Sequence, residues 1–570
     1  MVDQEKLTDD ALSEDIPLST LSVWHHLPPE IVSKIFVYKY YESQSKQKEL
    51  TPPQYIELYT ILLVCRWWYL VAIGCPYLWS YISSSLTAEH TKIFLYRSKQ
   101  VPIWVQPTCL LNLPQVQDIS SLRLILQEYH RIKSLHILIT WDVAEVLADL
   151  YPPLSSPFIQ TLSIDKRILD THNEHENYES IAASVLSLPF PFQPSPHLSI
   201  LHISGYTLGD IRHMFRPTLR ELYLLLYDEQ EDESGSDIAP SVDEILSLLG
   251  EMPLLEKVDI PTWLDNPVQL PRNFGNIALQ NLRILKLQLN KPDASFLKHI
   301  TFSPGVQLHL SAQCYVLDGE AFLNVFEPCT FACGFSTPGS AAVTVRSLDI
   351  HQSPHWTFTI KCWVVNVDFD IMWPSTQINN DDSPILELDF EYHVGIMIPE
   401  IYSVIPQCLD TSGIETLALS LAPGSDGQLA KRISRIIHLS YKMEKLHTLI
   451  TSQWSLHQLY QLIYGSEELY NQGTKLPALK TIYAPHLPTM LPIDWESLGS
   501  ILEDATPASD RTMTLHLWKD ALNGQSSRTQ LGNTNLQSQV RNTLFLHDEK
   551  LNDPDYAWYA TPVTPIPRDH

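Results

Sequence analysis

The chain has 570 residues, more than one ordinary domain needs, and its 44% hydrophobic content is ample for a large core or a repeat array. Its 38 lysines and arginines against 65 acidic residues give a formal charge of -27, which argues against nucleic acid or an anionic membrane as a partner, because both rely on basic patches. Eight scattered cysteines do not resemble a disulfide framework, and the acidic N-terminus differs from a signal peptide, so we expect a cytoplasmic or nuclear protein.

Residues 1–21 are charged and lack apolar periodicity, so we expect this acidic N-terminus to be disordered. A compact helical unit is predicted from 22 to 85. It begins with "LPPEIVSKIF" (27–36), which predicts a helix whose prolines suit a first turn. The residues expected on one face of this helix are Leu27, Ile31, Ile35 and Phe36. A polar linker is predicted at 42–54.

The next segment, "ILLVCRWWYLVAI" (61–73), is apolar or aromatic except for Arg66. A helix on the outside of a globular protein shows a polar face, and this predicted helix has almost none. Gly74, Pro76 and Arg66 leave fewer than the about 20 apolar residues that a membrane span needs. The helix therefore needs another cover, either the core of a large domain or a second protein.

A short pattern, apolar-x-x-apolar-x-apolar, recurs from residue 132 to residue 484 at intervals of a few tens of residues, which is typical of a solenoid. The alternation at its end predicts a short strand with one buried face. Between two of these motifs, a helix is predicted from a capping Ser241 to a turn near Gly250. Strands followed by returning helices would bury a core that no single repeat could bury. The motifs occupy 132–137, 159–164, 198–203, 219–224, 255–260, 282–287, 345–350, 385–390, 414–419, 446–451 and 479–484.

Four segments depart from this pattern. The interval 288–344 has no clean motif and is interpreted as a degenerate repeat or an insertion. Residues 228–237, with six acids in ten, and residues 374–384 are interpreted as loops. Residues 523–570 are predicted to be a polar C-terminal tail.

Three stretches in order resemble an F-box: "LPPEI…IF" (27–36), "VCRWW" (64–68) and "PYLW" (76–79). The later motifs resemble leucine-rich repeats in an irregular form, and the combination is similar to the large F-box families of mushroom-forming (basidiomycete) fungi. The resemblance implies an α/β fold, with a small N-terminal three-helix F-box at 22–85 followed by an irregular leucine-rich-repeat-like α/β solenoid at 86–522.

The resemblance also implies a function. The chain would be a non-catalytic substrate-recognition adaptor of a Skp–cullin–F-box ubiquitin ligase, with a Skp-type adaptor as the missing cover and a cullin reached through it. The residues implied to bind the adaptor are Leu27, Pro28, Pro29, Glu30, Ile31, Ile35, Phe36, Val64, Cys65, Trp68, Leu78 and Trp79. The alternatives are that these residues only pack against the first repeats, that the chain is a non-degradative scaffold, or that the solenoid is a hydrolase with an unrecognised site.

In each repeat motif, the residue between the last two apolar positions is predicted to point away from the core, onto the concave face of the solenoid. These positions are His136, Ser163, His202, Tyr223, Asp259, Lys286, Asp349, Asp389, Ala418, Ile450 and Tyr483. We expect six of them to bind the substrate, namely His202, Tyr223, Asp259, Lys286, Asp349 and Asp389. With the chain at -27, a substrate with a basic segment is predicted. The alternative is that these carboxylates are ordinary solvated surface.

Catalytic and metal sites are weighed and set aside. The sequence has no G-x-S-x-G, H-E-x-x-H, phosphate-binding loop or C-x-x-C motif. His172 and His175 lack a third ligand and are interpreted as part of a solvated loop. Cys329 and Cys333 are interpreted as small buried residues. No metal or cofactor is expected.

Overall fold

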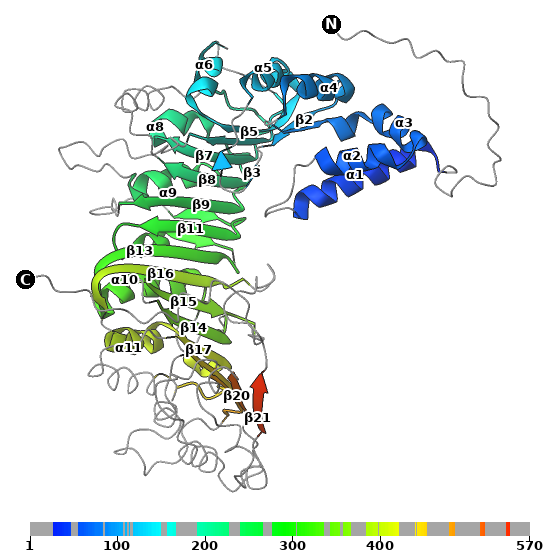
Figure 1. Cartoon of the computed structure of the whole chain (residues 1–570). Coiled ribbons are helices and arrows are strands. Elements are labelled where there is room, and N and C mark those ends of the chain that lie inside the picture. The colour runs from blue at the N-terminus through cyan, green and yellow to red at the C-terminus, as the bar shows by residue number, and fades with distance from the viewer. Residues whose placement is uncertain are drawn as a thin grey trace, which may run out of the picture. The chain divides into compact units, whose positions relative to one another are not determined.

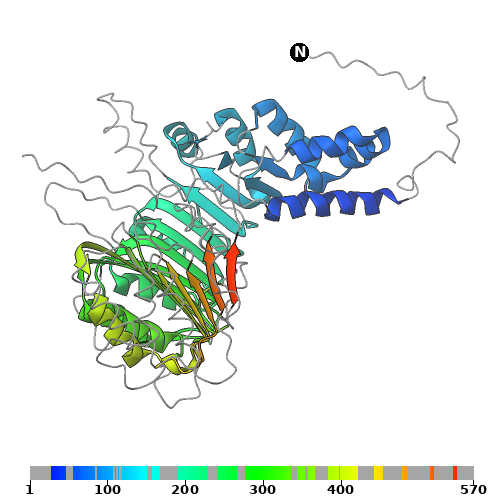
Figure 2. The same ribbon diagram turned by 60° about the horizontal axis from the view of Figure 1, so that its bottom comes forward.

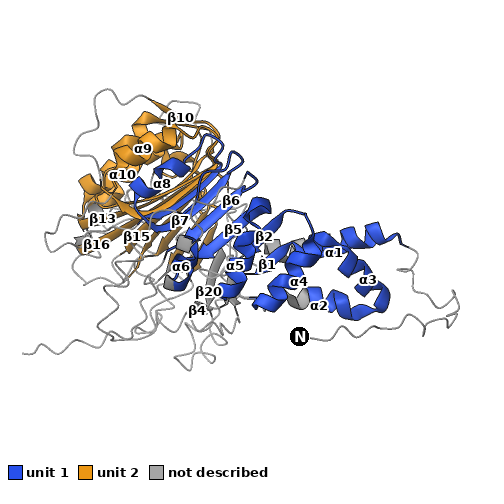
Figure 3. Ribbon diagram, turned by 90° about the horizontal axis from the view of Figure 1, so that it is seen from above, with its two compact units in different colours: residues 1–229 blue, residues 230–570 orange. Residues whose placement is uncertain are grey.

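We describe the chain from a computed structural model, shown in two views in Figures 1 and 2. It divides into two compact units, residues 1–229 and residues 230–570, which Figure 3 colours separately. Each unit has its own set of buried apolar side chains. The residues that the structure describes are 27–46, 55–83, 86–106, 109–110, 113–114, 118–149, 157–166, 191–226, 240–265, 276–303, 305–335, 343–353, 357–365, 383–396, 398–420, 439, 442–452, 478–484, 514–518 and 543–547.

Unit 1 begins with a small helical domain. Its elements are α1 (Pro29–Lys46), α2 (Tyr55–Val64), α3 (Arg66–Gly74) and the short 3-10 helix η3 (Pro76–Trp79). The three α-helices contact one another, and η3 contacts α1. The helix predicted at 27–36 is confirmed, and it continues to Lys46, into the segment predicted to be a linker.

The single helix predicted at 61–73 is wrong, because the chain breaks at Cys65. This residue has an extended backbone, with φ -163° and ψ 165°, and it is the N-cap of α3. Its sulfur accepts a hydrogen bond from the backbone N–H of Trp68 at 3.4 Å. The bond satisfies one of the N–H groups that a helix start leaves without a partner. The apolar stretch is therefore divided between two helices, α2 and α3, that Cys65 separates.

Within the described part of unit 1, six parallel strands pair in chain order. They are β1 (Tyr81–Ser83), β2 (Ile103–Gln106), β5 (Ile132–Leu138), β6 (Thr161–Asp165), β7 (Ile200–Tyr206) and β8 (Glu221–Leu226). The connections contain α4 (Ala88–Ser98), α5 (Ile119–Gln127), η4 (Tyr129–Arg131), α6 (Trp141–Asp149), α8 (Leu208–Ile211), η5 (Arg212–Met214) and a small hairpin of β3 (Cys109–Leu110) and β4 (Leu113–Pro114). Because β1 follows η3 after one residue, the sheet begins directly at the end of the helical domain.

Eleven strands in the described part of unit 2 form one sheet. In spatial order they are β9 (Lys257–Leu264), β11 (Ile284–Leu289), β13 (Gln307–Leu317), β16 (Leu386–Ile396), β15 (Thr357–Trp363), β14 (Ser347–Gln352), β17 (Thr416–Ser420), β18 (Thr448–Ser452), β19 (Thr481–Ala484), β20 (Thr514–Trp518) and β21 (Thr543–His547). All neighbouring pairs are parallel except the two that β15 makes with β14 and β16. A smaller parallel pair joins β10 (Ile277–Leu279) to β12 (Ile300–Phe302).

In the middle of this sheet the chain order is reversed. Strand β13 pairs with β16, which comes later in the chain than β14 and β15, and β14 pairs with β17 on the other side. Helix α10 (Gly319–Ala332) precedes β14, and α11 (Ile398–Cys408) follows β16. These two helices pack side by side, as both views show. The interval 288–344 therefore holds a long strand and a helix, and the antiparallel strand β15 was not predicted.

The mixed α/β prediction is confirmed, and each of the eleven motifs overlaps a strand. The ladder continues beyond the predicted boundary at 522, because β21 lies within the segment predicted to be a polar tail. The helix predicted after Ser241 is confirmed as α9 (Val242–Gly250), and Ser241 and Glu244 form a reciprocal capping box. Within the described ranges, no helix combines the length and apolar character needed to cross a membrane.

The helices of unit 2 cover one face of its strands. In α10 the ring of Phe322 lies 6.2 Å from Phe358 of β15 and 5.5 Å from Phe390 of β16. Phe358 and Phe390 are buried, whereas the residues next to them along each strand are more exposed. Figure 3 shows α9 and α10 on the same side of this unit. We call the opposite side of the strands, in either unit, the open face.

Candidate functional site

The helical domain has a compact aromatic core. Phe36 of α1 is 2% exposed, and its ring lies 4.8 Å from that of Trp68 in α3. Leu78 and Trp79 of η3 are buried as well, and the indole N–H of Trp79 donates a hydrogen bond to the carbonyl of Ala72 at 2.9 Å. Three of the residues implied to bind the adaptor, Phe36, Leu78 and Trp79, are therefore core residues of the domain itself.

The four residues predicted to share one face at α1 are divided between the core and the surface. Val32 and Phe36, four residues apart, point into the core, while Ile31 and Ile35 are 43% and 40% exposed. Leu27 is half-buried. The helix carries apolar residues on both sides, so periodicity in the sequence did not decide between them. Of the residues predicted to share one face, Ile31 and Ile35 therefore lie on the surface, whereas Phe36 lies in the core.

Exposed apolar side chains occur on every element of this domain. Leu63 of α2 is 82% exposed and Leu70 of α3 is 57% exposed. On α1 the exposed residues are spaced by three and four positions, which places them on one side of that helix. We call the whole set the apolar outer face: Ile31, Ile35, Tyr38, Tyr59, Leu63, Val64, Tyr69, Leu70 and Tyr77. Of the other implied adaptor-binding residues, Cys65 and Trp68 are half-buried, and Pro28, Pro29 and Glu30 are exposed.

Trp79 also connects the helical domain to the first helix beyond it. Its ring lies 5.1 Å from that of Phe94 in α4, in an edge-to-face arrangement. The guanidinium of Arg97, also on α4, stands 4.3 Å above the same indole. Aromatic pairs and cation–π contacts of this kind each contribute on the order of 1 kcal/mol when they are shielded from water. One tryptophan therefore belongs to two neighbouring cores.

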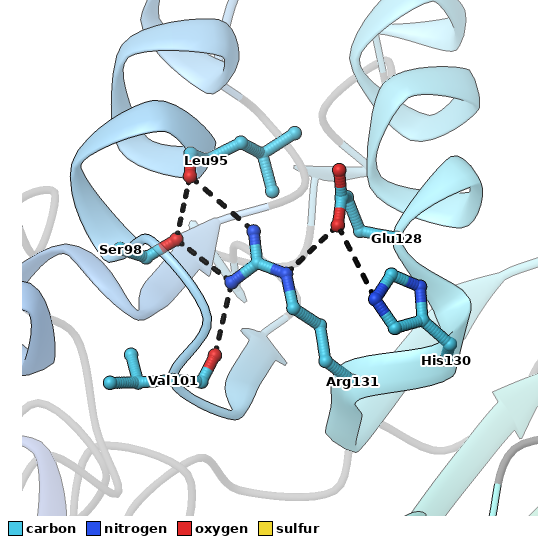
Figure 4. A network of polar contacts seen from close by, with 6 residues as sticks. All are labelled: Leu95, Ser98, Val101, Glu128, His130 and Arg131. Carbon is cyan, nitrogen blue, oxygen red and sulfur yellow. Dashed lines mark hydrogen bonds and ion pairs between the residues drawn. The ribbon is translucent and has the colours of Figure 1, made fainter.

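A buried arginine holds the C-terminal end of α4 in place (Figure 4). Arg131, the last residue of η4 before β5, donates to the hydroxyl of Ser98 and to the carbonyl of Val101, both at 3.0 Å. It donates a third, longer bond to the carbonyl of Leu95 and pairs with Glu128 at 2.9 Å. The carbonyls at the end of a helix have no partner within the helix, and the planar guanidinium supplies donors to them. Sequence reasoning missed this residue, because nothing in its motif distinguishes it from a surface arginine.

The open face of unit 1 carries the row predicted for it. His136, Ser163, His202 and Tyr223 are direct neighbours on β5, β6, β7 and β8. The rings of His202 and Tyr223 lie 5.8 Å apart. Burial, with a smaller contribution from nearby His202, lowers the pKa of His136 to about 4. His136, the first residue of this row, is therefore uncharged at physiological pH.

In unit 2 the predicted row is only partly correct. Asp259 lies opposite Lys286, as predicted. Asp349, Ala418, Ile450 and Tyr483 are also neighbours on four successive strands. Ala418 and Ile450 are nevertheless buried, so the prediction that all of these positions are exposed on the open face is wrong there.

Asp389 does not lie in the row of Asp349. Its neighbours are Ser311 on β13 and Thr359 on β15, which lie two residues along their strands from the residues in the row of Asp349. Glu387 occupies the position that the motif assigned to Asp389. In the sequence, the motif at 385–390 was aligned with the other motifs by its apolar residues. In the structure, the antiparallel pairings of β15 with β14 and with β16 determine which residue of β16 lies in the row of Asp349. His309, Lys361 and Glu387 were all missed, and the apolar alternation in 307–310 and 357–362 was the available signal.

No group of three or more histidine, cysteine or acidic residues within the described ranges is arranged to hold a metal. Cys329 and Cys333 are buried, as interpreted from the sequence, and burial raises the pKa of both thiols. The predictions for residues 1–21, for His172 and His175 and for the acidic segment 228–237 lie outside the described residues.

Comparison with known proteins agrees with the geometry of the helical domain. Residues 24–85 match the family model described as F-box-like. The match begins just before α1 and ends just after β1, so it covers the whole apolar outer face. No curated protein matches the sequence. The chain thus contains an F-box-like domain, which supports its being an F-box protein, followed by a long parallel sheet.

Proposed function

We propose that the chain is a substrate-recognition adaptor of a Skp–cullin–F-box ubiquitin ligase. The F-box-like domain suggests a role in substrate recognition by such a ligase in general. In the proposal, the apolar outer face binds a Skp-type adaptor and, through it, a cullin. The parallel strands and their helices form an irregular leucine-rich-repeat-like solenoid, and its open face binds the protein to be ubiquitinated.

The apolar outer face is the observation that carries this proposal. Leu63 alone exposes 82% of its surface, and it shares α2 with exposed Tyr59 and Val64. Nine large apolar side chains are exposed among the described residues of this one small domain, and a concentration of exposed apolar side chains is typical of a binding site rather than of a protein that works as a monomer. Large apolar and aromatic side chains at the centre of an interface supply most of its binding energy. A Skp-type adaptor is the occupant that the F-box-like match indicates.

The mechanism would be proximity. The adaptor holds a substrate lysine near the charged conjugating enzyme and thereby raises its local concentration. Orientation of the two reactants removes much of the entropic cost of their encounter. The chain itself would make and break no bonds and would need no cofactor.

Leu63→Asp is the direct test of adaptor binding. Burying a leucine stabilises an interface by about 2 kcal/mol, and a carboxylate in its place adds a desolvation cost, so affinity for the Skp-type adaptor should fall by at least thirtyfold or so. The matched control is Phe331→Asp, because Phe331 is 66% exposed on α10 in unit 2. Both variants should unfold at the temperature of the wild type, since neither side chain is buried.

The readout is binding of purified Skp-type adaptor, followed by coprecipitation of a cullin. Equal binding by the wild type and Leu63→Asp would remove the F-box interpretation. Binding of the adaptor without any cullin would favour the non-degradative scaffold. Loss of binding in Phe331→Asp as well would show that the loss is not specific to the apolar outer face.

The substrate is proposed to present a basic segment. The chain carries a net charge of -27, and Asp259, Asp349, Glu387 and Asp389 all lie on strands of unit 2 at open-face positions. Complementary charge speeds association and suppresses wrong partners, and its contribution falls as salt rises. Affinity for the substrate should therefore decrease between low and physiological ionic strength.

A further inference from the structure

The four central strands of unit 2 carry two parallel rows of polar side chains on the open face. Each row has one residue from each of β13, β16, β15 and β14, and the pairings of these strands place the four residues of a row in register. Buried apolar residues, such as Leu388 and Ile360, separate the two rows along the strands. We call the two rows together the polar lattice. Its first row is His309, Glu387, Lys361 and Asp349, and its second row is Ser311, Asp389, Thr359 and His351.

Glu387 is fully paired within the lattice. One of its oxygens lies 2.7 Å from Nδ1 of His309, and the other lies 2.6 Å from Nζ of Lys361. Burial would raise the pKa of Glu387, but the hydrogen bond from His309 and the ion pair with Lys361 outweigh it and lower the pKa to about 2. The one lysine of the lattice is therefore committed to this carboxylate.

Asp349 is left without such a partner. Its Oδ1 is shielded from solvent and accepts no hydrogen bond from any residue that the structure describes. Burial raises the pKa of Asp349 to about 7; nearby Lys361 opposes the shift and Glu387 adds to it. A shielded carboxylate oxygen without a donor carries the full cost of its desolvation, of the order of 1–3 kcal/mol or more.

The charges around Asp349 do not remove this cost. His351, two residues along β14, has its pKa lowered by burial and then by Lys361. On the other side, β17 contributes the uncharged Ala418. Asp389 receives a hydrogen bond from Thr359 at 2.6 Å and adds a further negative charge. The lattice thus has three carboxylates and one lysine, and both Lys361 and His309 contact Glu387, which leaves the shielded oxygen of Asp349 without a cationic partner among the described residues.

We propose that Asp349 anchors a cationic side chain, lysine or arginine, of the protein that binds on the open face of unit 2. The inference rests on the proposed substrate-binding role of that face and identifies one subsite within it. The incoming group would donate a charge-assisted hydrogen bond to the carboxylate, of the kind that contributes about twice as much as a neutral one. An anchor at the centre of the sheet would also fix the register of the bound segment.

The test uses the full chain in complex with the Skp-type adaptor, titrated with an oligoarginine, an oligolysine or an oligoglutamate peptide. Asp349→Asn should weaken binding of at least one cationic peptide about tenfold, which corresponds to about 1.4 kcal/mol. Glu251→Gln is the matched control, because it removes the same charge from an exposed side chain at the C-terminal end of α9, outside the polar lattice, and it should weaken binding by no more than about twofold. The two cationic peptides distinguish a guanidinium from an ammonium group.

A second measurement isolates Asp349 from the other titratable groups of the lattice. Because the protonated carboxyl cannot pair with a cation, binding to the wild type should tighten from pH 6 to pH 8 as Asp349 loses its proton. The increase should be smaller in Asp349→Asn, which keeps every other titratable group of the lattice. Asp349→Ser should behave like Asp349→Asn, so that the comparison holds if one variant folds poorly.

Three outcomes would overturn the subsite. These are no measurable binding of either cationic peptide, equal losses in Asp349→Asn and Glu251→Gln, and identical pH dependence in the wild type and Asp349→Asn. Binding of the Skp-type adaptor is measured on the same samples. If adaptor binding persists while the subsite fails, the ligase-adaptor proposal survives, whereas loss of adaptor binding in the wild type would contradict that proposal itself.

Discussion

Replacing Arg131 by alanine tests whether the network in Figure 4 holds the first helix of the repeats to the sheet. The side chain is only 6% exposed and donates to Ser98, Val101, Leu95 and Glu128. Removing it leaves the carbonyl of Val101 and the carboxylate of Glu128 without this donor, whereas the carbonyl of Leu95 still accepts a hydrogen bond from the Ser98 hydroxyl at 3.0 Å. The perturbation is local, because all of these partners lie between α4 and the start of β5.

The expected loss of stability follows from burial. Breaking a buried ion pair costs about 3–5 kcal/mol, and the lower end applies because Glu128 is one-third exposed and regains water. A loss of about 3 kcal/mol in a unit of this size lowers the unfolding temperature by roughly 6–12 °C. The unfolding temperature of Arg131→Lys should lie between those of the wild type and Arg131→Ala, because an ammonium group keeps the charge but loses the planar arrangement of donors.

The assay is amide hydrogen exchange in the full chain, which reports α4 and β5 separately from unit 2. A loss of 3 kcal/mol should speed exchange of their most protected amides about a hundredfold. Arg216→Ala is the control, because Arg216 is exposed, and it should change stability by less than about 0.5 kcal/mol. If Arg131→Ala exchanges no faster than Arg216→Ala, the network does not join these elements.

Two further predictions concern Cys65 and His136. Cys65→Ala removes the acceptor for the N–H of Trp68 and should cost about 1 kcal/mol in denaturant unfolding, whereas Cys65→Ser keeps an acceptor; equal stability of the two variants would argue against a capping role. The pKa of His136 in the folded chain is about 4, below the ordinary value of about 6.5, so the unfolded chain takes up the proton first and stability falls as pH drops from about 6.5 to 4. His136→Gln should lose roughly 2 kcal/mol less than the wild type between pH 7 and pH 5, and parallel stability curves would contradict this.

Local signals in the sequence predicted local structure well. The capping pair Ser241 and Glu244 set the start of α9, and the short apolar motifs marked the strands, because both depend on neighbouring residues only. The break at Cys65 was missed, since a cysteine is an unusual helix cap and its apolar neighbours favoured one continuous helix. For α1 the sequence carried apolar residues on both sides, and only packing against Trp68 selected the side with Val32 and Phe36 over the side with Ile31 and Ile35.

The candidate site was harder to predict because it depends on contacts between distant residues. Asp349 was identified from its motif, and Glu387 was missed in favour of Asp389, because the antiparallel strand β15 fixes the register of β16. Strand β15 carries no copy of the repeat motif, so its Lys361 was not identified from the sequence. Its role follows only from its place in the sheet, close to Glu387 and Asp349. Likewise, no sequence pattern showed that Ala418 and Ile450 would be covered on both sides.

The reversed order of β14, β15 and β16 has a consequence for how the chain folds. In a simple repeat array each new unit adds to the one before it, and folding spreads by nearest-neighbour contacts. Here one of the two partners of β13 is β16, which lies far along the chain: Glu387 of β16, which contacts His309 of β13, comes 78 residues later. Such non-local pairing slows folding, because a long loop must close before any contact compensates for it. During synthesis, strands made before this point can assemble in order, whereas β13 to β17 must form together, as one cooperative block that divides an otherwise sequential process.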